Sequence, residues 1–279
     1  MVDYAKTHAF WEARGKNAGL DELNVTMLRE RLPELAAFID RAEKAHLRRV
    51  LRLNRDMDVL DLGCGAGRMA IEFARACRSV VAVDFSQALV DRGRELAQRH
   101  GLANVRWVTA SVVEFASDEQ FDIIFAGGLL PYLSDADVAR VLGATHGMLK
   151  PGGRFVSRNM VLSEKEAQPP TTPPDYEVTY RRTADYVAFF QAAGFEIAYM
   201  NEAFAFPAPA YLYDRFLPDR IKYAASMRAV LAAALSLYGL VDPLILRFPR
   251  LNSLLAGRRA KIVQSIAVCR GGRRPPTML

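Results

Sequence analysis

Residues 59–68, VLDLGCGAGR, carry three glycines at every second position after an apolar run that ends in an acid. Gly63 and Gly65 match the first two glycines of the dinucleotide-binding pattern G-x-G-x-x-G, but the third, Gly67, comes one position early. A glycine turn lets a ligand lie against bare backbone. Asp61 would place a negative charge beside that ligand. This disfavours a pyrophosphate and favours a ligand that carries an ammonium and a sulfonium group.

A second acid follows the next apolar run. Asp84 ends VVAVD, 17 residues after Gly67. At the carboxyl edge of an open parallel sheet, such a residue points into the crevice where ligands bind. A carboxylate there can accept hydrogen bonds from both hydroxyls of a ribose, which fits any adenosine cofactor. An acid at a strand end can also be a simple helix cap, but the two acids at this spacing together predict a cofactor site.

The elements that must position these acids alternate between short apolar strands and helices. Strands are predicted at residues 57–62, 79–86, 105–110, 121–130, 152–161, 195–204 and 261–269. Helices are predicted at residues 20–53, 69–77, 87–100, 135–149 and 183–194, with further helical stretches near 219–238 and 243–256. The alternation predicts an α/β fold: a Rossmann-like, doubly wound, mostly parallel seven-stranded sheet.

Composition and pattern divide the chain into four parts. We predict an N-terminal helical lid segment (1–53), a cofactor-binding Rossmann-like core (54–203), a helical cap inserted before the last strand (204–258), and the last core strand with a basic tail (259–279). Within the cap, the apolar stretch AVLAAALSLYGLV is shorter than the roughly 20 residues of a membrane span. No transmembrane span is therefore predicted. Three roles remain open for this stretch: a buried helix of the cap, an apolar lid over a lipophilic substrate, or a surface in peripheral contact with a membrane.

The bulk properties exclude several classes of protein. The net charge is +6, but the basic residues are scattered and no aromatic-interleaved basic motif occurs, so nucleic acid is not the expected partner. Cys64, Cys77 and Cys269 have no zinc-ligand spacing, which predicts reduced thiols and no metal site. The N-terminus lacks the pattern of a signal peptide. We expect a cytoplasmic protein with a small-molecule substrate. The pattern does not indicate an oligomeric state.

The chain resembles the class I S-adenosylmethionine-dependent methyltransferases over residues 57–200 and again at 260–269. Four landmarks carry the resemblance in order: VLDLGCGAGR, VVAVDFS, MLKPGGRFV and YVAFFQAAGFEI. The resemblance implies S-adenosylmethionine as cofactor and S-adenosylhomocysteine as product. It also implies that the glycine motif holds the methionine part, that Asp84 binds the ribose and that Phe85 packs on the adenine. The other cofactor contacts that it implies are Asp61, Gly63, Cys64, Gly65 and Gly67 in the motif, Ser111 and Val112 beside the adenine, and Ala126 and Gly127 on the methionine side.

The N-terminal segment HAFWEARG resembles the aromatic-rich helix that folds over the cofactor in many small-molecule methyltransferases. Tyr4, Trp11 and Arg14 are the candidates for this contact. Arg14 could pair with the carboxylate of the cofactor. The alternative is a surface arginine and a core tryptophan.

Methyl transfer from a sulfonium is an in-line displacement, so the protein mainly holds the acceptor and the methyl group in contact. A base is needed only if the acceptor must lose a proton. The segment GGLLPYLSD lacks the [DN]-P-P-[YF] motif of relatives that methylate nucleobases or glutamine amides. It also has no histidine near Pro131, where many small-molecule relatives have one. The candidate catalytic residues are therefore His8, Tyr132 and Asn159.

Substrate-binding candidates lie near the end of the fifth predicted strand and after the proline-rich stretch AQPPTTPPD. Arg158 can hold an acid group, and Asn159 can orient a hydroxyl or an amine, but alternation within a strand lets only one of them face the cleft. Tyr180 and Arg181 are further candidates, with solvated side chains before a helix as the alternative.

The expected function is methylation of a small molecule, with an oxygen of a lipophilic or aromatic metabolite as the first candidate acceptor, as in natural product biosynthesis. The hydroxyl of a sugar or lipid-linked glycan and the nitrogen of a small amine remain alternatives. A catalytically silent cofactor-binding partner subunit also stays open. A nicotinamide oxidoreductase is disfavoured by Asp61 and by the displaced third glycine.

Overall fold

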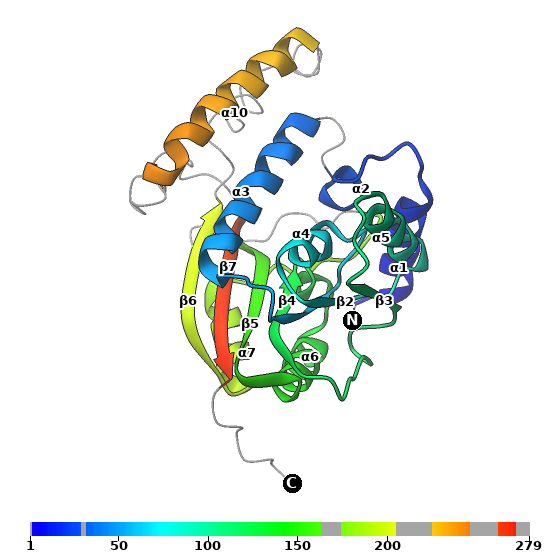
Figure 1. Ribbon diagram of the computed structural model, residues 1–279, viewed down its shortest axis with the longest axis vertical. Coiled ribbons are helices and arrows are strands. Elements are labelled where there is room, and N and C mark those ends of the chain that lie inside the picture. Colours follow the sequence, from blue (N-terminus) through cyan, green and yellow to red (C-terminus); the bar gives the residue numbers. More distant parts are fainter. Residues whose placement is uncertain (1, 29–31, 163–173, 205–224, 246–261, 272–279) are drawn as a thin grey trace.

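The computed structural model describes residues 2–28, 32–162, 174–204, 225–245 and 262–271 (Figure 1). Seven strands form one sheet in the order β3-β2-β1-β4-β5-β7-β6, in which β7 runs antiparallel to both of its neighbours. The predicted doubly wound, mostly parallel, seven-stranded sheet is confirmed. The strands are β1 (Asp58–Leu62), β2 (Ser79–Asp84), β3 (Val105–Thr109), β4 (Phe121–Gly127), β5 (Leu149–Leu162), β6 (Phe195–Phe204) and β7 (Ile262–Gly271).

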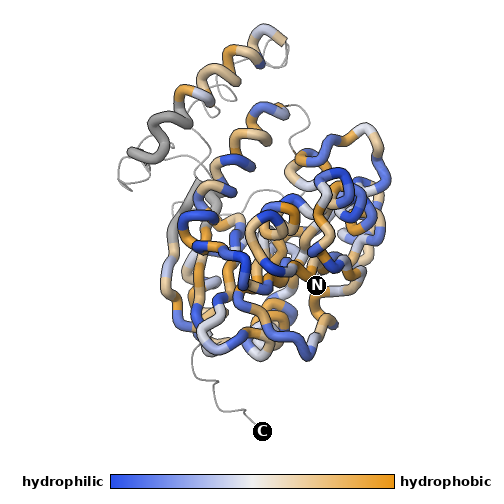
Figure 2. Tube along the Cα trace, viewed as in Figure 1, coloured by the Kyte–Doolittle hydropathy of each residue, from blue (hydrophilic) through white to orange (hydrophobic). Residues whose placement is uncertain are grey.

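Helices cover both faces of the sheet, and Figure 2 shows apolar residues along the strands between them. Helices α3 and α4 pack on one face through residues such as Leu47 and Phe73, and helices α6 and α7 pack on the other through residues such as Val138 and Phe190. The described helices are α1 (Tyr4–Lys16), α2 (Asn24–Met27), α3 (Pro33–Leu51), α4 (Arg68–Ala76), α5 (Gln87–Arg99), α6 (Asp135–Gly147), α7 (Thr183–Ala192), α10 (Ala225–Ile245) and the 3-10 turn η1 (Leu130–Tyr132).

The predicted helix over residues 20–53 is wrong in one respect, because it is two helices. The backbone leaves α2 at Leu28, which has a left-handed φ of 56°, and re-enters a helix at Pro33. Proline has no N–H to continue a helix from the preceding turn, and it disfavours helical geometry in the residue before it. It does fit the first turn of a new helix. The break frees α2 to lie against the glycine turn.

The helix α10 lies between β6 and β7 in the sequence and packs against α3 (Figure 1). Leu231 and Leu235 bury their side chains against Leu35 of α3, and Arg228 forms a salt bridge with Glu34. The remaining helical stretches of the predicted cap, the proline-rich segment and the basic tail fall largely or wholly outside the described residues. None of the described helices combines the length and apolarity needed to cross a membrane.

Candidate functional site

A cavity of about 440 Å³ opens at the carboxyl ends of β1, β2, β4 and β5. This is the edge of a parallel sheet at which ligands bind, beside the point where the strand order reverses between β1 and β4. The helices α1, α2 and α3 supply its other walls. Its lining includes Trp11, Thr26, Glu43, Asp61, Gly63, Cys64, Gly65, Arg68, Asp84, Phe85, Phe125, Gly127, Gly128, Leu129, Tyr132, Arg158, Met160, Tyr176 and Tyr180.

The glycine turn has left-handed backbone at all three glycines, with φ of 68° at Gly63, 54° at Gly65 and 82° at Gly67. A Cβ on Gly65 would lie 2.7 Å from Cγ2 of Thr26, so this glycine allows α2 to approach the turn. A Cβ on Gly67 would lie 2.4 Å from the ring of Trp107. Gly63 and Gly65 line the cavity, whereas Gly67 serves the packing of α4 against β3 and does not reach the lining.

Asp84 braces this turn from the end of β2. One carboxylate oxygen accepts the backbone N–H of Gly65 at 2.8 Å, and the other accepts that of Ser86 at 3.0 Å. The side chain is buried, and burial raises the pKa of Asp84 to about 6. Asp84 therefore holds the turn in shape and still lines the cavity, where a ligand hydroxyl could reach the same carboxylate.

Asp61 is the second acid of the lining, and it has an orphaned atom. The residue is 1% exposed, and its Oδ2 has no hydrogen-bond partner among the described residues. Burial raises the pKa of Asp61 to about 7, and the negative charges of Asp84 and Glu43 add to this while Arg68 opposes it. A buried carboxyl without a partner is costly unless a donor fills the gap. The cavity beside it therefore fits a ligand with a cationic donor.

An ion network from α3, which the sequence analysis did not anticipate, closes the cavity on the β5 side. Glu43 accepts Arg68 at 2.8 Å on one oxygen and Nε of Arg158 at 2.9 Å on the other, while Asp40 accepts Arg68 at 2.8 Å. The two arginines hold the pKa of Glu43 down at about 2 despite complete burial. A helical wheel could have revealed this network, because Asp40 and Glu43 share a stripe with the buried Leu47.

Aromatic rings form another part of the lining, which we call the aromatic wall. The ring centroids of Trp11 and Tyr132 are 5.8 Å apart, those of Tyr132 and Tyr176 are 5.9 Å apart, and Phe10 lies 4.6 Å from Tyr176. Burial raises the pKa of Tyr132 strongly, so its hydroxyl stays protonated and can only be a hydrogen-bond donor or a neutral acceptor at working pH. Tyr180 completes this wall.

Several predicted site residues lie outside the lining of the cavity. Arg14 donates to the backbone carbonyls of Asn24 and Val25 and so fastens α2 to α1. Tyr4 bonds through its hydroxyl to Asp137. The others that stay outside are His8, Ser111, Val112, Ala126, Asn159 and Arg181.

Three of these residues have visible structural roles. His8 is exposed, and its ring lies 5.1 Å from that of Phe85. Asn159 is 2% exposed and donates to Ser157, on the face of β5 opposite to Arg158. Arg181 is 4% exposed and donates to Asp135 and to the backbone carbonyls of Leu130 and Leu133, so it anchors the segment after the fourth strand.

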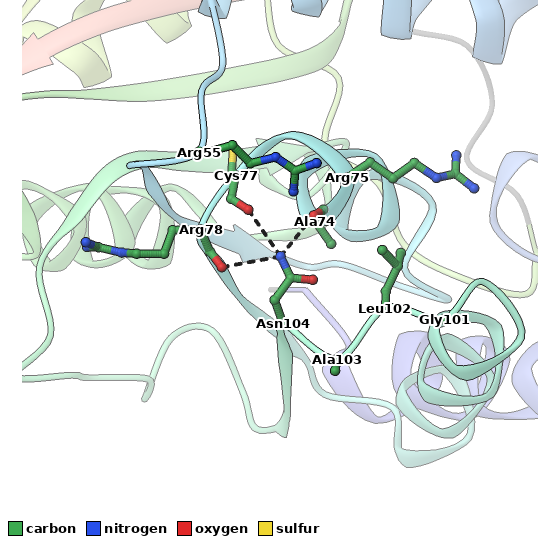
Figure 3. Close-up of a pocket in the computed structure, with 9 residues that line it drawn as sticks. All are labelled: Arg55, Ala74, Arg75, Cys77, Arg78, Gly101, Leu102, Ala103 and Asn104. Carbon is green, nitrogen blue, oxygen red and sulfur yellow. Dashed lines mark hydrogen bonds between the residues drawn. The ribbon is translucent and has the colours of Figure 1, made fainter.

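A larger cavity, of about 650 Å³, lies at the amino ends of β1, β2 and β3, away from the glycine turn (Figure 3). Figure 3 shows the amide nitrogen of Asn104 among three backbone carbonyls, those of Ala74, Cys77 and Arg78, to which it donates. Arg78 is itself paired with Asp58. Asn104 and Arg78 are thus engaged in hydrogen bonds that stabilise the fold, and we propose no ligand site in this cavity. In the described part of the chain, no group of three or more potential metal ligands gathers.

The comparison with known families agrees with this geometry. Residues 59–153, from β1 to β5, match the model of a family described as a methyltransferase domain. These residues therefore carry a methyltransferase domain of that family. The matched residues include the glycine turn, Asp84 and the end of β4, but they stop before Arg158 and the tyrosines of the aromatic wall.

The proteins to which the chain is similar differ in what their names say they methylate. A phosphoethanolamine N-methyltransferase 1 of Triticum aestivum is 29% identical over 54% of the chain and 29% of the relative. A ubiquinone biosynthesis O-methyltransferase of Bradyrhizobium sp. (strain ORS 278) is 29% identical over 54% of the chain and 56% of the relative. The chain thus spans less than two thirds of these relatives. A geranyl diphosphate C-methyltransferase of Streptomyces coelicolor A3(2) has a similar structure, with a TM-score of 0.61 and 15% identity over 96% of the chain and 97% of that chain.

The two buried acids, Asp61 and Asp84, predict that ligand binding in this cavity depends on pH. In the ligand-free protein both have a raised pKa, so their contribution to stability is full below their ordinary pKa of 3.8 and is lost as the pH rises through about 6 to 7. Ligand hydroxyl and ammonium groups favour the ionised carboxylates. We therefore expect S-adenosylhomocysteine to bind about tenfold more tightly near pH 7.5 than near pH 5, with release of protons near pH 6. Calorimetry in two buffers of different ionisation enthalpy measures both effects, and a flat profile without proton release would contradict the prediction.

Proposed function

We propose that this chain binds S-adenosylmethionine in the 440 Å³ cavity and transfers its methyl group to a small molecule. The observation that carries the proposal is the buried, unpartnered Oδ2 of Asp61 beside a glycine turn that Asp84 braces. Asp84 would take the ribose hydroxyls, Phe85 would pack on the adenine, and Asp61 would accept the ammonium group of the methionine part. Gly127 and Gly128 leave room for that part at the end of β4.

The cofactor supplies a methyl group already activated on a sulfonium. The contribution of the chain is then to exclude water and to hold the acceptor in line with that methyl group, and such positioning can supply about 7–11 kcal/mol of the barrier in favourable cases. The aromatic wall and the side chain of Arg158 line the same cavity as Gly127 and Gly128, which supports this role for them.

For the acceptor, we propose an oxygen of a lipophilic or aromatic metabolite. The rings of Trp11, Tyr132 and Tyr176 offer flat apolar surface on which such a molecule can stack. The similarity to a ubiquinone biosynthesis O-methyltransferase supports this class of acceptor. Three free, buried cysteines support action in a reducing compartment such as the cytoplasm.

A small amine is the second candidate, because clustered aromatic rings also attract cations. The similarity to a phosphoethanolamine N-methyltransferase supports this second class. A positive charge on Arg158 in the same cavity opposes it, since a substrate ammonium close to the guanidinium would be repelled.

The test of the proposed function uses methyl-labelled S-adenosylmethionine and an extract of cells that express the chain. After incubation with the purified protein, the products are partitioned between solvent and water. We expect label in the organic phase with the unaltered protein and none with an Asp84→Ala variant. Label in the aqueous phase alone would overturn the lipophilic acceptor in favour of a sugar or a polar amine. Cofactor binding with no label transferred to any extract would instead favour a catalytically silent partner subunit.

A further inference from the structure

The side chain of Arg158 is held in the wall of the cavity with its terminal nitrogens uncommitted. Its Nε donates to Glu43 at 2.9 Å, and this is the hydrogen bond that the described residues provide for the guanidinium. Gly128 lies against the other end of the group, where a Cβ would come within 3.0 Å of Nη1. The side chain is 15% exposed. A guanidinium anchored through Nε presents its two remaining nitrogens as a fork, the geometry that matches an oxyanion.

The surroundings leave this fork positively charged. Arg158, Arg68 and Lys44 pair with two carboxylates, those of Glu43 and Asp40. Asp61 also interacts with Arg68, and its pKa is raised to about 7, so the cluster carries one excess positive charge while Asp61 is protonated. Each oxygen of Glu43 accepts a hydrogen bond from one of the two arginines. An acceptor with an ionised acid group would restore neutrality at the wall, where partial burial makes the interaction stronger than in water.

The described residues of this lining offer no strong base to an acceptor. Among the described residues that line the cavity there is no histidine, and the three carboxyls belong to Glu43, which is engaged by two arginines, and to Asp61 and Asp84 at the cofactor end. The remaining titratable groups near Arg158 are Tyr132, Tyr176 and Tyr180, and burial raises the pKa of Tyr132 and Tyr180. A neutral alcohol would find no good acceptor for its proton here.

We propose that the acceptor is an oxyacid, a carboxylate or a phosphate-type acid on an apolar or aromatic body, whose ionised oxygen is itself the nucleophile in the fork of Arg158. The inference rests on the proposed function and deepens it. A lone pair of the anionic oxygen forms the new bond to the methyl carbon, the carbon–sulfur bond breaks, and its electron pair stays on sulfur. An anion and a sulfonium become a neutral or less charged ester and a thioether, and no proton is transferred.

The first experiment compares acceptors that share one skeleton and differ in the nucleophile. Purified protein and methyl-labelled S-adenosylmethionine are incubated with 3-phenylpropionate, 3-phenylpropanol, 3-phenylpropylamine or 3-phenylpropylphosphonate. We expect transfer to one of the two acids to exceed transfer to the alcohol and the amine by about 100-fold, as a charge-assisted pair with arginine allows. The methyl ester of the carboxylate releases labelled methanol in mild alkali, whereas the methyl ester of the phosphonate is stable. This difference shows which of the two acids was methylated. Preference for the alcohol or the amine overturns the proposal.

The second experiment places the acid on Arg158. Arg158→Met should lower kcat/KM for the preferred acid by roughly 10- to 100-fold while the affinity for S-adenosylhomocysteine stays within about twofold. Arg158→Lys keeps the charge near Glu43 without the fork, and it should retain the fold and lose part of the activity. Arg140→Met, an exposed change of the same kind on α6, is the matched control.

The outcomes distinguish a failure of the oxyacid proposal from a failure of the proposed function. A fall in cofactor affinity that parallels the fall in kcat/KM would assign the fork to the carboxylate of the cofactor, and it would overturn the oxyacid proposal while leaving the proposed function intact. Failure of the unaltered protein to bind S-adenosylhomocysteine would overturn the proposed function itself.

Discussion

Asp84→Ala is expected to weaken the binding of S-adenosylhomocysteine by about 100-fold or more. The variant loses the carboxylate that would accept the ribose hydroxyls, and hydrogen bonds to a charged group contribute roughly 1.5–3 kcal/mol each. It also removes the acceptor of the Gly65 and Ser86 N–H groups, so the glycine turn loses its brace. Isothermal titration at a fixed pH near 7.5 measures the change.

Two further variants separate the causes of that loss. Asp84→Asn keeps an oxygen for one backbone N–H and removes the charge, so we expect a smaller loss, of about tenfold. Asp91→Ala removes a carboxylate that is 46% exposed on α5, and it should leave affinity unchanged. Affinity within threefold of the unaltered protein for Asp84→Ala would remove Asp84 from the site.

Glu43→Gln is expected to lower the free energy of unfolding by about 3–5 kcal/mol, the range for breaking a buried ion pair from one side. Arg68, whose side chain is 9% exposed, and Arg158 would both lose the negative charge that balances them. A glutamine can still accept one hydrogen bond, but it cannot compensate a guanidinium. Urea unfolding monitored by circular dichroism gives the value, and Glu95→Gln on the exposed side of α5 is the matched control.

The loss of unfolding free energy in Glu43→Gln should also become smaller as the pH falls. The pKa of Glu43 is lowered from 4.5 to about 2, so its stabilising contribution is full above pH 4.5 and disappears as the pH falls toward 2. The difference between the unaltered protein and Glu43→Gln should therefore shrink over that interval. A difference below about 1 kcal/mol near pH 7 would show that the network contributes little to stability.

The sequence was most informative where the chemistry is local. The glycine turn and Asp84 occupy fixed positions relative to two successive strands, so the spacing of Gly63, Gly65 and Asp84 predicted that they would meet at one edge of the sheet. The structure places them together in the lining of one cavity. The fold itself followed from the alternation of strands and helices.

Long-range partners could not be predicted in the same way. Arg158 and Asn159 were equivalent on sequence grounds, and only the register of β5 between β4 and β7 turns Arg158 toward the cavity. Glu43 lies 115 residues before its partner Arg158, and its helix reached the cavity only because Pro33 separated it from α2. Arg14 looked available for a cofactor carboxylate on sequence grounds, and the sequence did not reveal that its Nε and one terminal nitrogen donate to backbone carbonyls of α2.

The place of β7 in the sheet has a consequence for the time course of synthesis. β7 is the last strand in the chain, but it separates β5 from β6. Strands β1 to β5 can pair as soon as they leave the ribosome, whereas β6 has no sheet neighbour until β7 follows. Between Phe204 and Ile262 the ribosome needs roughly 3–10 s at ordinary elongation rates. For that interval β5 presents an open edge to other nascent chains. Slower translation of the connecting segment would prolong the exposure, so codon choice there bears on the yield of folded protein.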